Sequence, residues 1–201
     1  LRADLNEDEL FAYIDFVAEF TNKPITCAET WDVWERIPDL AKHVDFITIH
    51  ILPYWEKVPI DRFNDFIIEK YTLVEKLFPY TKINIGETGW PSHGYNNNNA
   101  VPSLKNQAVA IRGFINLASE KGWDYNIVEA FDQQWKGYDE GNVGQYWGIF
   151  TSDRELKFYL SGDIELNQYW LYQMIAAIII GALLTIYGLR NQRLNISHAL
   201  A

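Results

Sequence analysis

The chain has 201 residues, of which 48% are hydrophobic and 22% charged, a composition typical of one folded domain with a short additional segment. Its formal net charge of −10 disfavours nucleic acid as a partner, because a polyanion is repelled by an acidic surface. The single cysteine, Cys27, and four histidines without metal-ligand spacing predict no intrachain disulfide, no metal site and no cofactor.

Aromatic residues make up 15% of the chain, including 8 tryptophans and 12 tyrosines. Flat amphipathic rings of this kind stack against sugars and also fill protein cores. The composition therefore agrees with a carbohydrate-binding protein, while a role in the core stays open for each individual tryptophan.

Residues 1–165 alternate helical and strand-like segments. The first segment is amphipathic, with Leu10, Ile14, Val17 and Phe20 at helical spacing. Runs rich in β-branched residues then alternate with further helical stretches. In chain order we expect a helix over 7–20, a strand over 24–28, a helix over 31–42, a strand over 44–50, a helix over 63–78, a strand over 82–87, a helix over 105–121 and a strand over 125–131.

This alternation predicts an α/β fold with a parallel sheet and helices packed outside it. Four such units are half of an eight-stranded TIM (β/α)8 barrel, so we expect residues 1–165 to be the C-terminal half of a barrel with two open sheet edges. Leu1 is not a methionine, and the residues after it do not form a signal peptide. We therefore expect an N-terminally truncated chain whose partner is the missing N-terminal half-barrel.

The stretch over residues 166–189 contains 24 residues and no charged one, whereas about 20 apolar residues are enough to span a membrane. Tyr169 and Trp170 lie where an aromatic belt would meet one interface, and Arg190 and Arg193 follow the stretch. Because positive flanks stay cytoplasmic, we expect residues 1–165 outside, a transmembrane helix over 166–189 and a cytoplasmic tail over 190–201. The alternative is a buried core helix.

Polar and aromatic side chains gather where the predicted strands end. The carboxyl ends of parallel strands carry the chemistry of such folds. We therefore expect a substrate site built from Glu29 after the first strand, His50, Tyr54 and Trp55 after the second, Glu87 and Trp90 after the third, and Asp132, Gln133 and Trp135 after the fourth.

Glu87 is the sharpest candidate for chemistry. It ends an apolar strand and precedes a turn whose Gly89 and Pro91 restrict the backbone. A retaining glycosidase uses one carboxylate as nucleophile, about 5 Å from a second carboxyl group that protonates the leaving oxygen. From the residues alone, a strand-end glutamate bonded to neighbouring amides stays an equal alternative.

The run Ile85-Gly86-Glu87-Thr88-Gly89-Trp90-Pro91-Ser92 resembles the nucleophile signature of glycoside hydrolase family 17. Three further segments resemble that family in the same order, namely residues 44–55, residues 127–136 and the Trp-Gly-Ile-Phe segment within 144–150. The resemblance covers nearly all of residues 1–160. It points to the bacterial membrane-associated branch, described as β-glucan synthases or β-1,3-glucan transglycosylases.

The resemblance implies a TIM barrel that acts on β-1,3-glucans with retention of configuration, with Glu87 as nucleophile. It also implies that Tyr54, Trp90, Lys136 and Glu140 line the cleft. Two departures matter. The family's acid/base glutamate, in a Gly-Asn-Glu turn, would precede residue 1 and is absent, and Gln133 stands where many plant members have Glu, which weakens any inference about that subsite.

Several of these residues have a plainer interpretation. For Glu29 two interpretations are open: it replaces the missing acid/base glutamate, or it forms hydrogen bonds within the cleft or orients Trp31. His50 shuttles protons, or it bonds a substrate hydroxyl or a neighbouring carboxylate. Lys136 and Glu140 have the spacing of a surface ion pair on a helix.

These observations together predict a retaining β-1,3-glucan hydrolase or transglycosylase whose catalytic part faces the periplasm or exterior from a bacterial inner membrane. Because the acid/base glutamate is absent, we expect the chain alone to be inactive. A non-catalytic, membrane-anchored carbohydrate-binding module is the main alternative, and a membrane-anchored scaffold that binds no sugar is a third.

Overall fold

The computed structural model describes residues 5–164, 167 and 169–199. The chain divides into two units, Leu1–Ile164 and Glu165–Ala201. The expected domain end at residue 165, the expected helix start at residue 166 and the segment Leu1–Asp4 lie outside the described residues.

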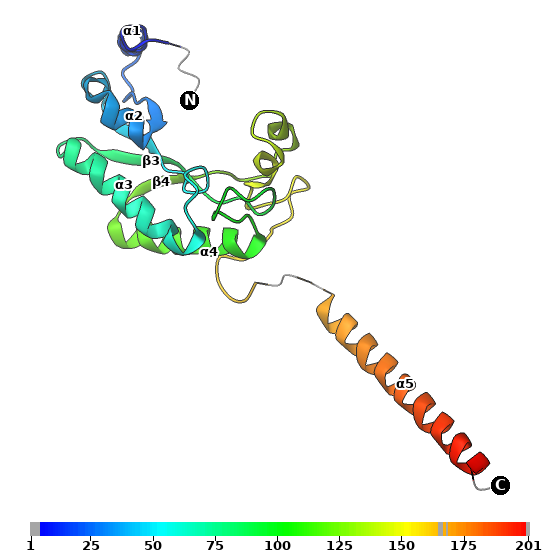
Figure 1. Ribbon diagram of the computed structural model, residues 1–201. Helices are drawn as coiled ribbons and strands as arrows, with labels where there is room; N and C mark the ends of the chain where they lie inside the picture. The colour runs from blue at the N-terminus through cyan, green and yellow to red at the C-terminus, as the bar shows by residue number, and fades with distance from the viewer. Residues whose placement is uncertain (1–4, 165–166, 168, 200–201) are drawn as a thin grey trace. The chain divides into compact units, whose positions relative to one another are not determined.

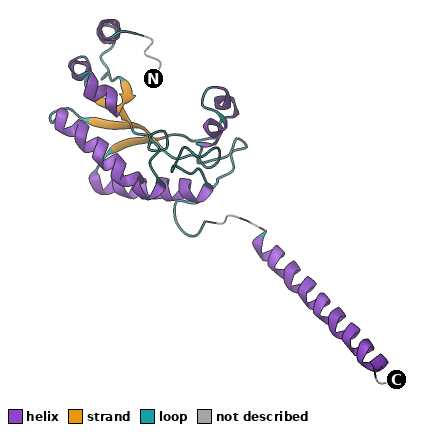
Figure 2. Ribbon diagram, in the orientation of Figure 1, coloured by secondary structure: helices purple, strands orange, loops and turns teal. Residues whose placement is uncertain are grey.

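A four-stranded parallel sheet forms the centre of the first unit (Figures 1 and 2). Its strands follow one another in chain order, which confirms the predicted parallel α/β arrangement. The strands are β1 (Ala28–Thr30), β2 (Ile47–His50), β3 (Ile83–Thr88) and β4 (Asp124–Ile127).

Helices connect successive strands and cover one face of the sheet. Of these, α2 (Trp31–Arg36) packs beside α3 (Phe63–Leu77), which packs beside α4 (Leu104–Lys121), and Figure 2 shows α3 and α4 running along one face of the sheet. The Ser103 hydroxyl caps the start of α4, and Gly122 ends that helix in the left-handed region at φ 67°. Side chains buried between the helices and the sheet form the core: Ile47, Ile49, Ile83, Ile85, Ile67, Tyr71, Val74, Phe114 and Ala118.

Helix α1 (Glu7–Glu19) precedes the sheet and begins with a capping box. The Asn6 side chain accepts a hydrogen bond from the Glu9 amide, and the Glu9 carboxylate accepts one from the Asn6 amide. This reciprocal pair satisfies two amides that a helix start leaves unbonded. The observed helix agrees with the predicted helix over 7–20, except that it ends one residue earlier, at Glu19.

The expected helix over 31–42 is two shorter helices in the structure. A 3-10 helix, η1 (Pro38–Lys42), follows α2 after Ile37. Proline lacks an amide proton and its ring clashes with the preceding turn, so Pro38 starts a new helical segment instead of continuing α2.

Strand β1 begins four residues later than predicted. The Ile25 amide donates to the Asp45 side chain, and ladder pairing with β2 starts only at Ala28, opposite Thr48. Glu29 therefore lies within β1, opposite Ile49, and not after the end of a strand.

Strand β4 leaves the ladder earlier than the predicted end at residue 131. After Ile127 the backbone turns to residues 147–150, where Glu129 accepts from the Ile149 amide and Ala130 from the Phe150 amide. An isolated parallel bridge joins Phe131 to Phe150. The closing segment thus lies against the end of the fourth strand.

The second unit contains one long helix, α5 (Trp170–Ala199). Within it, Trp170–Asn191 is 22 residues long with a mean hydropathy of 1.9 and is long and apolar enough to cross a membrane.

Candidate active site

A β-bulge turns the Glu87 side chain toward the carboxyl-end site. Ile83, Ile85 and Thr88 are buried, whereas Asn84, Gly86 and Glu87 are half-buried. Strict alternation would place Glu87 on the same face as Ile85, which is the face that the helices cover. Ile85 pairs with Ile49 but Glu87 pairs with His50, so β3 carries one extra residue at this point. Such a bulge moves the following side chain to the opposite face.

Gly86 is the residue that this bulge accommodates. A Cβ atom there would lie 2.4 Å from Thr48 Cγ2 and 3.0 Å from both Cδ2 and Nε2 of His50. At Gly89, two residues after Glu87, an added Cβ would lie 2.2 Å from the Val128 carbonyl oxygen. The two glycines of the signature are therefore required by close packing between neighbouring strands.

Glu87 lies at ion-pair distance from His50. The Nδ1 atom of His50 is 3.2 Å from Oε2 of Glu87, and the two side chains are 20% and 42% exposed. The polar contact with His50 holds the pKa of the Glu87 carboxyl below its ordinary value. Burial opposes this shift, and the electrostatic interactions with His50 and Lys136 add to it. Glu87 is therefore held as a carboxylate.

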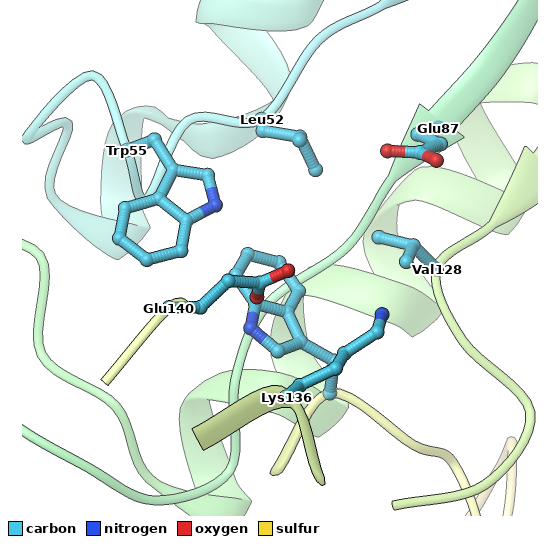
Figure 3. A pocket seen from close by; sticks show the side chains of 7 residues that line it. Leu52, Trp55, Glu87, Val128, Lys136 and Glu140 are labelled. Carbon is cyan, nitrogen blue, oxygen red and sulfur yellow. The ribbon is translucent and has the colours of Figure 1, made fainter. Parts of the chain in front are cut away.

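A pocket of about 110 Å³ opens beside Glu87. Figure 3 shows Trp55 and Glu140 facing Glu87 and Val128 across this pocket, with the Lys136 ammonium pointing toward the side where Val128 and Glu87 lie. Of the residues predicted from the sequence, the pocket brings together Trp55, Glu87, Lys136 and Glu140. Its remaining walls are Leu52, Val128 and Trp147.

The two pocket carboxyl groups have opposite pKa shifts. Burial raises the pKa of Glu140, Lys136 lowers it, and the negative charges of Glu129 and Glu87 raise it further. Glu140 thus favours its protonated form more than an ordinary glutamate does, while Glu87 favours its ionised form. The alternative interpretation of Lys136 and Glu140 as a surface ion pair is not what the structure shows, since Lys136 pairs with Glu129, and Lys136 and Glu140 both line the pocket.

Two tryptophans form one wall of the pocket. The rings of Trp55 and Trp147 stack with centroids 6.0 Å apart and an interplanar angle of 25°. Trp147 is 2% exposed, and its Nε1 has no hydrogen-bond partner among the described residues. A buried N–H without a partner costs about 1–3 kcal/mol.

Glu129 is a site residue that the sequence analysis missed. Its Oε2 accepts a hydrogen bond from Lys136 Nζ at 2.8 Å and another from Gln133 Nε2. Both the Lys136 and Glu129 side chains are largely buried, at 17% and 11% exposure. Glu129 thereby holds the ammonium beside the pocket. The sequence pattern did not indicate a role for Glu129, because this residue falls inside the run over 125–131 that was expected to be a buried strand.

Tyr54 and Trp90 lie beneath the pocket and do not line it. Both are fully buried and stack edge to face at 5.9 Å. Tyr54 donates its hydroxyl to the Tyr95 carbonyl, and Trp90 donates Nε1 to the Val101 carbonyl. Their polar atoms are thus used within the protein, and the rings support Trp147, which stacks edge to face on Tyr54.

Trp135 and Glu29 also lie outside the pocket walls. Trp135 is 59% exposed, with the Lys136 ammonium 6.0 Å from its ring centroid. Burial raises the pKa of Glu29, and the charge of His50 lowers it. The Glu29 Oε2 atom has no partner in the described part of the chain.

A buried ion pair holds the loops around the site. Lys157 Nζ lies 2.6 Å from Asp132 Oδ1 and donates to Ser92 Oγ at 2.8 Å. Asp132 Oδ1 also accepts from the Gly148 amide. This cluster ties the Ser92 turn after β3 to the ends of β4 and the closing segment. The sequence analysis did not identify Lys157, which is 65 residues from Ser92.

Residues 1–148 match the model of the BtgE/BtgC glycoside hydrolase domain. The chain belongs to this family. The family assignment confirms the resemblance found in the sequence. A glucan 1,3-beta-glucosidase of Saccharomyces cerevisiae is 28% identical over 156 residues, which cover 72% of this chain and 49% of the yeast protein. A probable beta-glucosidase btgE of Aspergillus fumigatus is 31% identical over 137 residues, covering 67% of this chain and 24% of that protein.

Solved structures of the family show the same fold. The glycoside hydrolase family 17 beta-1,3-glucanosyltransferase from Rhizomucor miehei superimposes with a TM-score of 0.73 at 27% identity, over 80% of this chain and 60% of that one. An active-site mutant of the Rhizomucor miehei enzyme, in complex with laminaritriose, gives a TM-score of 0.71 at 28% identity, over 78% and 57%. The chain thus spans about half the length of the yeast relative and a larger part of the structural relatives. The relatives named here are fungal, and the bacterial origin stays a prediction.

Proposed function

We propose that this chain carries the nucleophile of a retaining enzyme that hydrolyses or transfers β-1,3-linked glucans. The observation that carries the proposal is Glu87, an ionised carboxylate presented by a bulge into a pocket with stacked Trp55 and Trp147 walls. The family match over residues 1–148 supports it. It is also supported by the relatives, which are named as a glucan 1,3-beta-glucosidase and a beta-1,3-glucanosyltransferase.

In the proposed reaction a Glu87 oxygen attacks the anomeric carbon of a glucosyl unit. The new carbon–oxygen bond forms while the bond to the leaving oxygen breaks, and a second carboxyl group donates the proton that the leaving oxygen needs. Water or a sugar hydroxyl then intercepts the glucosyl-enzyme, which makes the outcome hydrolysis or transfer. The proposal assigns only the nucleophile to this chain.

The pocket residues have distinct proposed roles. Trp55 offers an aromatic wall to the apolar face of a sugar ring. The Lys136 ammonium supplies a donor for sugar oxygens, and Glu129 keeps that ammonium in place. Glu140, with its raised pKa, presents a carboxyl group to sugar hydroxyls.

Two further proposals extend this one. The four β/α units are part of an eight-stranded barrel, as the superposition on the glucanosyltransferase suggests. Helix α5 is a membrane anchor, supported by the apolar length of Trp170–Asn191. Because positively charged flanks stay in the cytoplasm, the end of the helix at Arg190 is cytoplasmic, and residues 1–165 lie outside the cell or in the periplasm.

A nucleophile can be tested apart from the proton donor. The full chain in detergent is incubated with a β-1,3-linked glucosyl fluoride that carries fluorine at C2, because fluoride departs without a proton and the C2 fluorine slows release of the adduct. Mass spectrometry should find the sugar on the peptide containing Glu87. The Glu87→Gln variant should form no adduct, whereas Glu120→Gln, an exposed control on α4, should react like wild type.

The same samples discriminate the alternatives. Calorimetric titration with laminaritriose measures binding in wild type and in Glu87→Gln. If wild type binds laminaritriose but forms no adduct, the chain is a carbohydrate-binding module. If wild type shows neither binding nor adduct, the alternative of a membrane-anchored scaffold remains. An adduct that persists in Glu87→Gln would assign the nucleophile to another residue.

A further inference from the structure

His50 lies where it controls one oxygen of Glu87. The bulge in β3 places Glu87 opposite His50, the last residue of β2. The distance from Nδ1 to Oε2 is 3.2 Å, and His50 is the more enclosed partner at 20% exposure. A carboxylate rotates about one bond, so a contact to one of its oxygens also determines where the other points.

The imidazole ring is itself held in place. Its Cδ2 and Nε2 atoms lie over Gly86, close enough that a Cβ would be 3.0 Å from both. The preceding Ile49 is fully buried in the core. The ring therefore packs on backbone next to a rigid strand, which is what a precise support for a reacting group requires.

Charged groups from three elements face this pair. Glu29 on β1 and Glu87 on β3 both interact electrostatically with His50, and Lys136 from η3 (Gln134–Tyr138) interacts with Glu87. His50 thus lies between two carboxyl groups. Among the described residues, only the Glu87 carboxyl lies within ion-pair distance of His50, which makes Glu87 the group that His50 contacts directly.

We infer that His50 is the positioning residue of the nucleophile, holding Oε2 of Glu87 so that Oε1 faces the anomeric carbon. This inference rests on the proposed function for its meaning in catalysis. It assigns His50 Nδ1 to the carboxylate and not to a substrate hydroxyl. It also gives Gly86 a role, because the ring reaches this position only over a residue without a side chain.

The first test measures the ionisation of Glu87 directly and needs no turnover. In full-length chain labelled with ¹³C at glutamate carboxyls, the Glu87 resonance is assigned by comparison with Glu87→Gln and followed with pH. His50→Leu should raise the pKa of Glu87 toward its ordinary value. His50→Asn, whose amide nitrogen replaces Nδ1, should have a smaller effect. An unchanged Glu87 pKa in His50→Leu would overturn the inference whether or not the protein is an enzyme.

The second test uses the rate of adduct formation with the glucosyl fluoride. His50→Leu should slow the maximal rate by about 10- to 100-fold, the effect of a misplaced reacting group, with little change in the half-saturating concentration. His50→Asn should recover part of the rate. A loss confined to the half-saturating concentration would make His50 a substrate ligand and overturn the inference. If wild type forms no adduct, the proposed function fails while the Glu87 titration still decides the role of His50.

Discussion

Replacing Gly86 by alanine tests whether close packing at the bulge supports both the fold and the nucleophile. The new Cβ would lie 2.4 Å from Thr48 Cγ2, whereas carbon atoms pack best at about 3.5–4.0 Å. The contact must therefore open by roughly 1.1–1.6 Å. Thr48 cannot rotate freely, because it is 5% exposed and its hydroxyl accepts a hydrogen bond from Thr26 at 2.9 Å.

The strands must therefore separate or Thr48 must lose its hydrogen bond. Overpacking of this kind costs about 1–3 kcal/mol. For a domain of this size each kcal/mol lowers the melting temperature by about 2–4 °C, so Gly86→Ala should melt roughly 2–12 °C below wild type. The same displacement moves Glu87 relative to His50, and an ångström of misplacement lowers a reaction rate by about 10²-fold.

The assays are thermal unfolding followed by circular dichroism and the rate of adduct formation with the glucosyl fluoride. Thr48→Ser supplies the matched rescue, because it removes Cγ2 and keeps the hydroxyl. The double variant should regain part of the lost stability, while the new Cβ contact with His50, at 3.0 Å, persists. A Gly86→Ala protein with the melting temperature and rate of wild type would refute the reasoning, as would a double variant that regains nothing.

Three further predictions concern the surroundings of the site. Lys157→Met leaves the buried Asp132 carboxylate without its ion pair and should cost about 3–5 kcal/mol in urea unfolding, whereas Ser92→Ala should cost less; equal losses would contradict this. Burial raises the pKa of Glu140, so its contribution to stability is present below the ordinary value of about 4.3 and is lost as pH rises through the folded-state pKa. Glu140→Gln should therefore gain stability at neutral pH, and the gain should vanish at low pH; a gain independent of pH would show another cause. A phosphatase that works only in the periplasm, fused after residue 201, should stay inactive, and an active fusion would reverse the proposed topology.

Much of the fold follows from local patterns in the sequence. The alternation of β-branched runs with amphipathic stretches predicts strands and helices, because side-chain periodicity reflects which face is buried. The predicted helices over 63–78 and 105–121 agree closely with α3 and α4. The position of Glu87 at a strand end made it the candidate nucleophile, because parallel strands bring their carboxyl ends to one edge.

The predictions were wrong where contacts between distant residues determine the position of a strand or a side chain. The first strand starts at Ala28, and before it Ile25 bonds Asp45 through both the backbone and the Asp45 side chain; no local pattern reports these bonds. Tyr54 and Trp90 were predicted to line the cleft, but their rings fill space under it. Aromatic residues suit both positions equally, so composition alone does not separate them.

What the sequence by itself determined is the parallel α/β fold, the family and the identity of the candidate nucleophile. Only the tertiary structure decided how Glu87 is presented. Period-2 alternation from Ile85 points its side chain at the helices, and the extra residue in β3 becomes visible only in its pairing with β2. The contacts of His50 and Glu129 were hidden for the same reason. They join residues on different strands and loops, and such contacts depend on register and packing across the sheet, which no single segment of the chain encodes.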